Sequence, residues 1–192
     1  MARIAHIERN TKETQISLTL NLDGGEVEIS TGIGFFDHML TALAFYAGFG
    51  LKLSCRGDLN VDCHHSVEDV GICFGLAMKQ ALGDRIGIRR YASSYVPMDE
   101  ALCFTALDFS NRAYHVFDAE MPQEKIGDYD SCMTREFMRA AAFNSGLTLH
   151  QKCLYGVNAH HITEALFKSF GFALKDAVRV EGDAVSSTKG VL

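Results

Sequence analysis

Residues 64–82, HHSVEDVGICFGLAMKQAL, and residues 160–178, HHITEALFKSFGFALKDAV, are two versions of one segment. The copies lie 96 residues apart, half the length of the chain, and share both histidines, the glutamate at the fifth position and a phenylalanine–glycine pair. Upstream, residues 38–53 align with residues 136–150 at an offset of 98. A match sustained over this length indicates an internal duplication.

Each half of the chain carries the pattern of several strands and two helices. Residues 14–22 alternate apolar and polar side chains, which is typical of a half-buried strand, and apolar residues recur at helical spacing after each histidine pair. We expect the first half to have strands near 3–9, 14–22, 26–30 and 51–56, and each half to have the order βββαβα. No flexible linker separates the halves, so residues 1–89 and 90–192 are expected to pack as one α+β unit.

Composition narrows the class of protein. The net charge of −6 over 192 residues argues against a general polyanion-binding surface. The longest apolar run, residues 39–51, is too short to span a bilayer, and the N-terminal residues contain no apolar signal core. The six cysteines have no C-x-x-C pairing and are expected to be reduced, buried thiols of a cytoplasmic protein.

The repeated motif offers nitrogen and oxygen ligands for a metal. His64 and Glu68 are four residues apart and share a helix face, whereas His65 projects elsewhere, so one segment has ligands on two sides. A solvated helix start is the simpler alternative for a single copy, but the motif occurs twice, and the duplication pairs upstream His38 with Glu136. The donors suit Mn, Fe or Zn. Spacing leaves open whether the two segments meet within one subunit or between subunits.

The C-terminal stretch VSSTKGVL, residues 185–192, places hydroxyls beside a lysine and a glycine. This combination suits an oxyanion such as phosphate, although a frayed polar tail is an alternative. Basic residues that are candidates to join such a site are Arg90, Arg112 and Lys168, which lies four residues after Glu164.

Three segments together, GIGFFDHML (32–40), the doubled histidine motif and SSTKGVL (186–192), resemble the imidazoleglycerol-phosphate dehydratases, manganese enzymes of histidine biosynthesis. The resemblance implies two βββαβα halves, each a four-stranded sheet with two helices, with the helices between the sheets. It also implies a homo-oligomer of 24 subunits with two Mn²⁺ ions per active site at subunit interfaces, acting on a small phosphate substrate without nucleic acid or membrane.

The resemblance assigns residues by motif. The implied metal ligands are His38, His64, His65, Glu68, Glu136, His160, His161 and Glu164. The implied phosphate-binding residues are Arg90, Arg112, Lys168, Ser187 and Lys189, and Glu13, at a strand start that aligns weakly with the segment around Glu100, is the implied substrate contact and general acid/base. This chain departs from the family pattern at Glu136, where many members have histidine, and at Ala42 and Tyr46, where others have glutamine and histidine.

A mechanism follows from these groups. In the reaction that the resemblance implies, the carbon proton to be removed is not next to a carbonyl. We therefore expect the two metals to bind the substrate imidazole as an imidazolate, which expels the adjacent hydroxyl and gives a diazafulvene-like intermediate. A base then removes the carbon proton, and the resulting enol ketonises to imidazole acetol phosphate.

Two other functions are considered. One is a ferritin-type di-metal oxidase or metal store. Such proteins carry Glu-x-x-His on long bundle helices, whereas here the order is His before Glu and strand patterns fill both halves. The other is a shell in which metal ions only hold subunits together. The phosphate-like C-terminal loop argues against this alternative, because such a shell has no need of a phosphate site.

Overall fold

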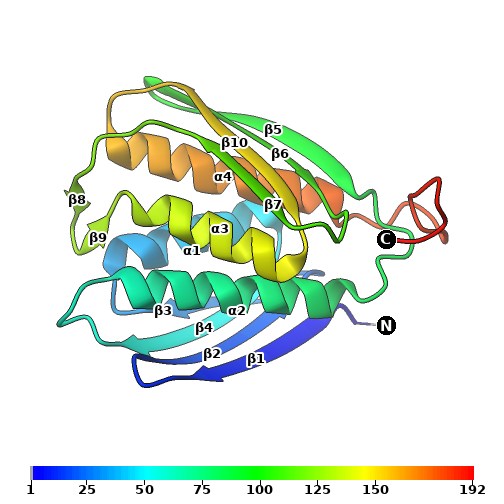
Figure 1. Cartoon of the computed structure of the whole chain (residues 1–192), viewed down its shortest axis with the longest axis horizontal. Helices are drawn as coiled ribbons and strands as arrows, with labels where there is room; N and C mark the ends of the chain where they lie inside the picture. The colour runs from blue at the N-terminus through cyan, green and yellow to red at the C-terminus, as the bar shows by residue number, and fades with distance from the viewer. Residues whose placement is uncertain (1) are drawn as a thin grey trace.

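The computed structural model describes residues 2–192 and has two four-stranded sheets on opposite sides of a layer of four helices (Figure 1). The first half contains β1 (Ile4–Asn10), β2 (Thr14–Asn21), β3 (Val27–Ser30), α1 (Gly34–Ala47), β4 (Gly50–Gly57) and α2 (His64–Leu82). The second half contains β5 (Tyr91–Met98), β6 (Ala101–Asp108), β7 (Tyr114–Asp118), β8 (Lys125–Ile126), β9 (Tyr129–Asp130), α3 (Met133–Ser145), β10 (Thr148–Tyr155) and α4 (Ala159–Ala177).

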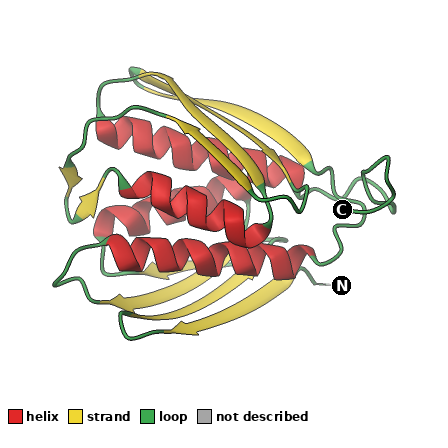
Figure 2. Ribbon diagram, in the orientation of Figure 1, coloured by secondary structure: helices red, strands yellow, loops and turns green. Residues whose placement is uncertain are grey.

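The two sheets have the same topology. Their strand orders are β1-β2-β4-β3 and β5-β6-β10-β7, and in each sheet only the last pair is parallel. The predicted α+β fold, duplicated with the helices inside, is confirmed (Figure 2). The short β8–β9 hairpin was not predicted and has no counterpart in the first half. The division into residues 1–89 and 90–192 stays a prediction.

The sheets form because alternate side chains on each strand are apolar. Along β2, Ile16, Leu18 and Leu20 are buried while the residues between them are exposed or half-buried. Antiparallel pairing places Ile16 opposite Cys55 and Leu18 opposite Leu53 of β4, so both strands turn their apolar sides toward the helices.

The helices pack in two pairs, each joining one helix from either half. Helix α1 runs parallel to α4, with His38 near Glu164 at one end and Tyr46 against Phe172 at the other. Helix α2 packs against α3 in the same way. All four helices therefore begin at the same end of the molecule, on the left in Figure 1.

Two glycines from the duplication allow these pairs to approach closely. A Cβ on Gly75 of α2 would lie 2.6 Å from the carbonyl oxygen of Ala141 in α3. A Cβ on Gly171 of α4 would lie 2.8 Å from the carbonyl oxygen of Leu43 in α1. Because such distances are shorter than van der Waals contact, only glycine permits this packing.

The main core extends across both halves and includes a cluster of aromatic rings around Phe36, Phe137 and Phe167. Four of the six cysteines are buried, but the expectation of burial is wrong for Cys132, which is exposed just before α3, and Cys153 is half-buried. None of the six forms a disulfide. Within residues 2–192, no helix is long and apolar enough to cross a membrane.

Candidate metal centre

Three of the predicted ligands converge where α1 and α4 begin. His38 comes from α1, and His160 and Glu164 lie one turn apart on α4; one ligand atom of each falls within 4.8 Å of the others. The Nε2 atoms of His38 and His160 lie 3.8 and 3.3 Å from Glu164 Oε2. Asn158 caps α4, because its side-chain oxygen accepts hydrogen bonds from the backbone N–H groups of His160 and His161.

Glu164 is charged although its side chain is only 7% exposed. Burial acts to raise its pKa, but the hydrogen bond and charge of Lys168 outweigh burial, so the pKa of Glu164 lies below its ordinary value. Lys168 Nζ binds Oε1 at 2.7 Å, which leaves Oε2 directed at the two imidazoles. Two imidazole nitrogens and a carboxylate oxygen arranged in this way suit a divalent transition metal.

The duplication places a second group of predicted ligands where α2 and α3 begin. His64 Nε2 lies 3.6 Å from Glu68 Oε2, as its counterpart does in the first cluster. Arg139 of α3 donates to both carboxylates here, with its Nη2 2.9 Å from Glu68 Oε1 and its Nε 3.0 Å from Glu136 Oε2. Among residues 2–192, only the first cluster brings three ligand atoms within 4.8 Å.

His65 and His161 do not join either cluster and are held by other carboxylates. His65 Nδ1 contacts Asp58 at 3.0 Å, and His161 Nδ1 contacts Glu100 at 2.6 Å. These hydrogen bonds raise the pKa of both histidines, and the bond from His161 lowers the pKa of Glu100 to about 2. Each ring thereby presents its other nitrogen, Nε2, as the available ligand atom.

Glu13 lies near this second face of the motif. Its Oε1 atom is 3.8 Å from His65 Nε2, and it borders a shallow groove of about 270 Å³ that also includes Arg56 and Asp58. In the second half, the weakly aligned Glu100 contacts His161 through the opposite ring nitrogen. The two glutamates are therefore not equivalent in their contacts.

Four of the five predicted phosphate-binding residues line one pocket of about 630 Å³ beside the C-terminus: Arg90, Arg112, Ser187 and Lys189. Arg90 is partly engaged, because it binds the Asp108 carboxylate at 2.6 Å and the Ser186 carbonyl oxygen at 2.6 Å. It thus anchors the C-terminal segment. Arg112 and Lys189 are exposed, and no ion pair involves them among residues 2–192.

Lys168 is not in this pocket but beside the first cluster. The ring of Tyr46 lies 5.5 Å from Lys168 Nζ, and Ala42 is buried on the same helix as Tyr46. Ala42 and Tyr46, the two α1 positions at which the sequence differs from the expected pattern, therefore lie on the side of the first cluster rather than beside the C-terminal pocket.

The predicted metal ligands and the pocket beside the C-terminus lie at opposite ends of the chain's fold. Helix α4 begins beside the first cluster, and the chain that follows its C-terminal end lies at the opposite side of the molecule (Figure 1). Residues 186–189 of that segment line the pocket. From Glu164 to the end of α4 at Ala177 there are 13 residues, which at about 1.5 Å per residue separate the two sites by roughly 20 Å.

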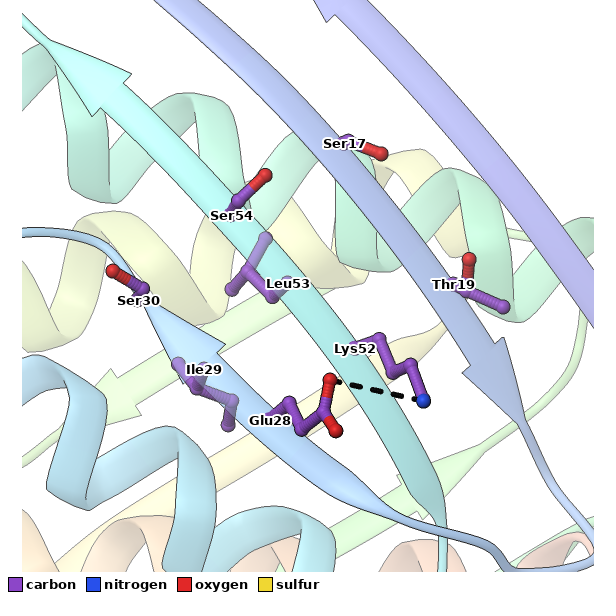
Figure 3. Close-up of a pocket in the computed structure, with 8 residues that line it drawn as sticks. All are labelled: Ser17, Thr19, Glu28, Ile29, Ser30, Lys52, Leu53 and Ser54. Carbon is purple, nitrogen blue, oxygen red and sulfur yellow. Dashed lines mark ion pairs between the residues drawn. The ribbon is translucent and has the colours of Figure 1, made fainter.

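Another hollow, of about 540 Å³, lies on the outer face of the first sheet, away from the helices (Figure 3). Its lining is mainly serine, threonine and an ion-paired lysine, Lys52, whose Nζ lies 2.6 Å from Glu26 and 3.7 Å from Glu28. It contains none of the predicted site residues.

Three residues that contact the predicted metal-binding residues were not identified from the sequence. Asn158 had a recognisable signal, since an asparagine before a helical motif is a typical N-cap. Arg139 had a weaker signal, because it stands three residues after Glu136 on a helix. Asp58 had none, because it reaches His65 from the loop after β4.

Comparison with known proteins agrees with this architecture. Residues 31–174 match the family model for imidazoleglycerol-phosphate dehydratase. The imidazoleglycerol-phosphate dehydratase of Acetivibrio thermocellus is 55% identical over 195 residues and is covered completely, as is this chain. That of Clostridium botulinum is 56% identical, with 99% of this chain and 98% of the relative covered.

Two solved structures of the same enzyme have this fold. The imidazoleglycerol-phosphate dehydratase of Staphylococcus aureus superposes with a TM-score of 0.85 at 36% identity, covering 92% of this chain and 99% of that one. The enzyme of Pyrococcus furiosus, solved in complex with (S)-C348, gives 0.85 at 39% identity, covering 97% and 100%. By sequence, length and fold, the chain belongs to the imidazoleglycerol-phosphate dehydratase family of hydro-lyases.

Proposed function

We propose that the chain dehydrates D-erythro-imidazole glycerol phosphate to imidazole acetol phosphate and water in histidine biosynthesis, using two Mn²⁺ ions per active site. The observation that carries the proposal is the convergence of His38, His160 and Glu164 in a member of this family. Their nitrogen and oxygen donors are those of a borderline divalent ion. The six free cysteines support a reducing location such as the cytoplasm.

The proposed ligands are the eight residues assigned by motif: His38, His64, His65, Glu68, Glu136, His160, His161 and Glu164. When bound, the metal ions would supply Lewis acidity that lowers the pKa of an imidazole and stabilises negative charge. Lys168 keeps the Glu164 carboxylate ionised and turned toward the imidazoles. Asp58 and Glu100 fix His65 and His161 with Nε2 directed away from their own hydrogen bonds.

The remaining proposed roles concern the substrate. Arg112, Ser187 and Lys189 bind the phosphate, with Arg90 holding the C-terminal segment in place and adding positive charge. Lys168 is a further phosphate contact beside the metal ligands. Glu13, 3.8 Å from His65, is within reach of a substrate bound there and serves as the general acid/base. Binding at both ends of the substrate fixes the reacting carbons relative to Glu13.

The separation of these groups supports an active site built from several copies of the chain. A small phosphate ester cannot extend across roughly 20 Å, most of the length of α4, so the metal end of one protomer must meet the phosphate pocket of another. His65 and His161, which join no cluster in their own chain, then become ligands at the contact. A 24-subunit shell is the assembly that the family resemblance implies.

Repeated apolar side chains also support association. Phe45 of α1 and Phe143 of α3 occupy equivalent positions and are 73% and 53% exposed. Leu76 of α2 and Phe172 of α4 are likewise equivalent and partly exposed. Exposed apolar side chains favour burial against a partner, and a second copy offers the same residues in return.

The proposal is tested by stripping metal from the protein and measuring dehydration of imidazole glycerol phosphate and particle size by light scattering, with and without Mn²⁺. We expect activity and a large particle to appear together on adding Mn²⁺, because interface ligands couple binding to assembly. A large particle without product would instead favour a structural role for the metal. Redox turnover without dehydration would favour the ferritin-type alternative.

A further inference from the structure

The two ligand clusters related by the duplication are not equal. In the first, Glu164 receives a lysine from its own helix, Lys168, through Oε1, and Oε2 remains turned toward the histidines. The counterpart of Lys168 in the first half is Ile72, which carries no charge. The second cluster therefore lacks this half-buried lysine and takes its positive charge from another element.

Arg139 supplies this positive charge and lies one turn after Glu136 on α3. Its Nε binds Glu136 at 3.0 Å and its Nη2 binds Glu68 at 2.9 Å, so the guanidinium lies between the two carboxylates. The counterpart of Arg139 in the first half is Thr41, whose hydroxyl donates to the carbonyl oxygen of Asp37. Among residues 2–192, a cation lies between two of the predicted ligand carboxylates only in the second cluster.

We infer that Arg139 is an internal counter-cation that occupies the second cluster until metal displaces it, so that the two clusters load metal unequally. The inference rests on the proposed metal centre and goes beyond it, because it assigns an order of loading. A guanidinium and a metal ion cannot both bridge Glu68 and Glu136, so binding at this cluster must break both ion pairs.

The exposure of these ion pairs makes displacement feasible. Arg139 is 46% exposed, Glu68 33% and Glu136 25%, whereas Glu164 and Lys168 of the first cluster are 7% and 16% exposed. Ion pairs exposed to solvent are weak and screened by salt, so Arg139 can swing into solvent at small cost. Lys168 has no need to move, because the Glu164 oxygen that faces the histidines is already available.

The test is equilibrium binding of Mn²⁺ to metal-stripped protein, followed by electron paramagnetic resonance of the free ion. We expect wild-type protein to show a tight and a weaker class of site. In Arg139→Gln the weaker class should tighten by about three- to tenfold, the effect of removing two exposed ion pairs, while the tight class stays unchanged. Arg139→Lys keeps a charge but cannot bridge both carboxylates, so its weaker class should fall between the two.

Arg135→Gln is the matched control. Arg135 is exposed one turn earlier on α3 and makes no ion pair with the ligand carboxylates among residues 2–192. This variant should bind Mn²⁺ as wild-type protein does, which separates the contact from the general loss of charge. If Arg139→Gln binds Mn²⁺ at the weaker class with unchanged or lower affinity, the inference is wrong. Lower affinity would show that Arg139 supports metal binding by holding the two carboxylates in place. Wild-type protein that neither binds Mn²⁺ nor dehydrates the substrate overturns the proposed function instead.

Discussion

Gly75 has no side chain because the backbone of α3 occupies the place where a Cβ would lie. The 2.6 Å distance to the Ala141 carbonyl oxygen requires α2 and α3 to separate if a methyl group is added. We expect Gly75→Ala to lower the free energy of unfolding by about 1–3 kcal/mol, more than alanine gains in helix propensity. Denaturant unfolding of the metal-free protein measures the change.

Gly34 of α1 provides the control for this substitution. A Cβ at Gly34 meets nothing within 4 Å, so Gly34→Ala should be neutral or slightly stabilising. Equal destabilisation by both variants would show that the loss does not arise from the α2–α3 contact.

His115 of β7 gives the molecule a specific sensitivity to acid. Burial, with a contribution from Arg135, lowers the pKa of His115 to about 4 from its ordinary value of 6.5. A lowered histidine pKa means that the unfolded chain binds the proton first, so stability is complete above pH 6.5 and falls as the pH drops toward 4. The loss is on the order of 3 kcal/mol.

The pH dependence of His115 can be isolated by substitution. In His115→Gln, the part of the stability loss between pH 6.5 and 4 that comes from this residue should disappear. His150 of the neighbouring strand β10 is exposed, so His150→Gln should retain it. Chemical unfolding of metal-free protein across this range measures both variants, and identical profiles for wild type and His115→Gln would contradict the assignment.

At the scale of elements, the C-terminal segment after α4 is the part of the chain for which we propose phosphate binding. Arg90 binds the Ser186 carbonyl oxygen and so holds this segment, and Lys189 lines the proposed phosphate pocket. We expect Lys189→Ala to raise the KM for the phosphate substrate by about 10- to 100-fold, the loss of one charge-assisted contact, with Mn²⁺ binding unchanged. Lys175→Ala, an exposed lysine at the end of α4, is the control.

The elements also show how far sequence reasoning extends. The repeat and the two periodicities predicted the βββαβα order, because apolar patterning is local and was present twice. The β8–β9 hairpin escaped prediction because its strands, Lys125–Ile126 and Tyr129–Asp130, are too short to carry a period. Which helices pair was also beyond the sequence, since packing of α1 on α4 is a contact between distant segments.

For the site, the sequence proposed which residues take part but not how they are grouped in space, and their roles stay predictions. The motif predicted His38, His160 and Glu164 as ligands of one kind, and the structure brings these three together. The pocket of Arg90, Arg112, Ser187 and Lys189 was likewise expected, apart from Lys168. Spacing could not show that the two sets lie at opposite ends of α4, because distance along a chain does not set distance in the fold.

At the scale of the whole molecule, the proposed sharing of the active site between chains predicts that two defective chains restore each other's activity. His160→Ala removes a proposed ligand and Lys189→Ala a proposed phosphate contact. After metal removal, mixing and reassembly with Mn²⁺, about a quarter of the sites should combine intact halves if two chains contribute at random. Activity at low substrate concentration should exceed that of either variant alone.

The double variant His160→Ala/Lys189→Ala is the control for this experiment. This variant carries both defects in one chain and is mixed with an equal amount of wild-type protein. If two chains contribute at random to each site, about a quarter of the sites take both halves from wild-type chains, so the mixture should have less than half of the wild-type activity. If the two single variants do not restore activity together, each chain completes its own site.

The parallel start of all four helices gives the protomer a head and a tail. A contact between the histidine end of one copy and the C-terminal end of the next is directional, so nothing in the contact itself limits how many copies join. Such a chain of contacts either closes through a fixed rotation or grows into an open filament. The angle at which two protomers meet, rather than the strength of their contact, therefore decides whether this enzyme forms a particle of definite size.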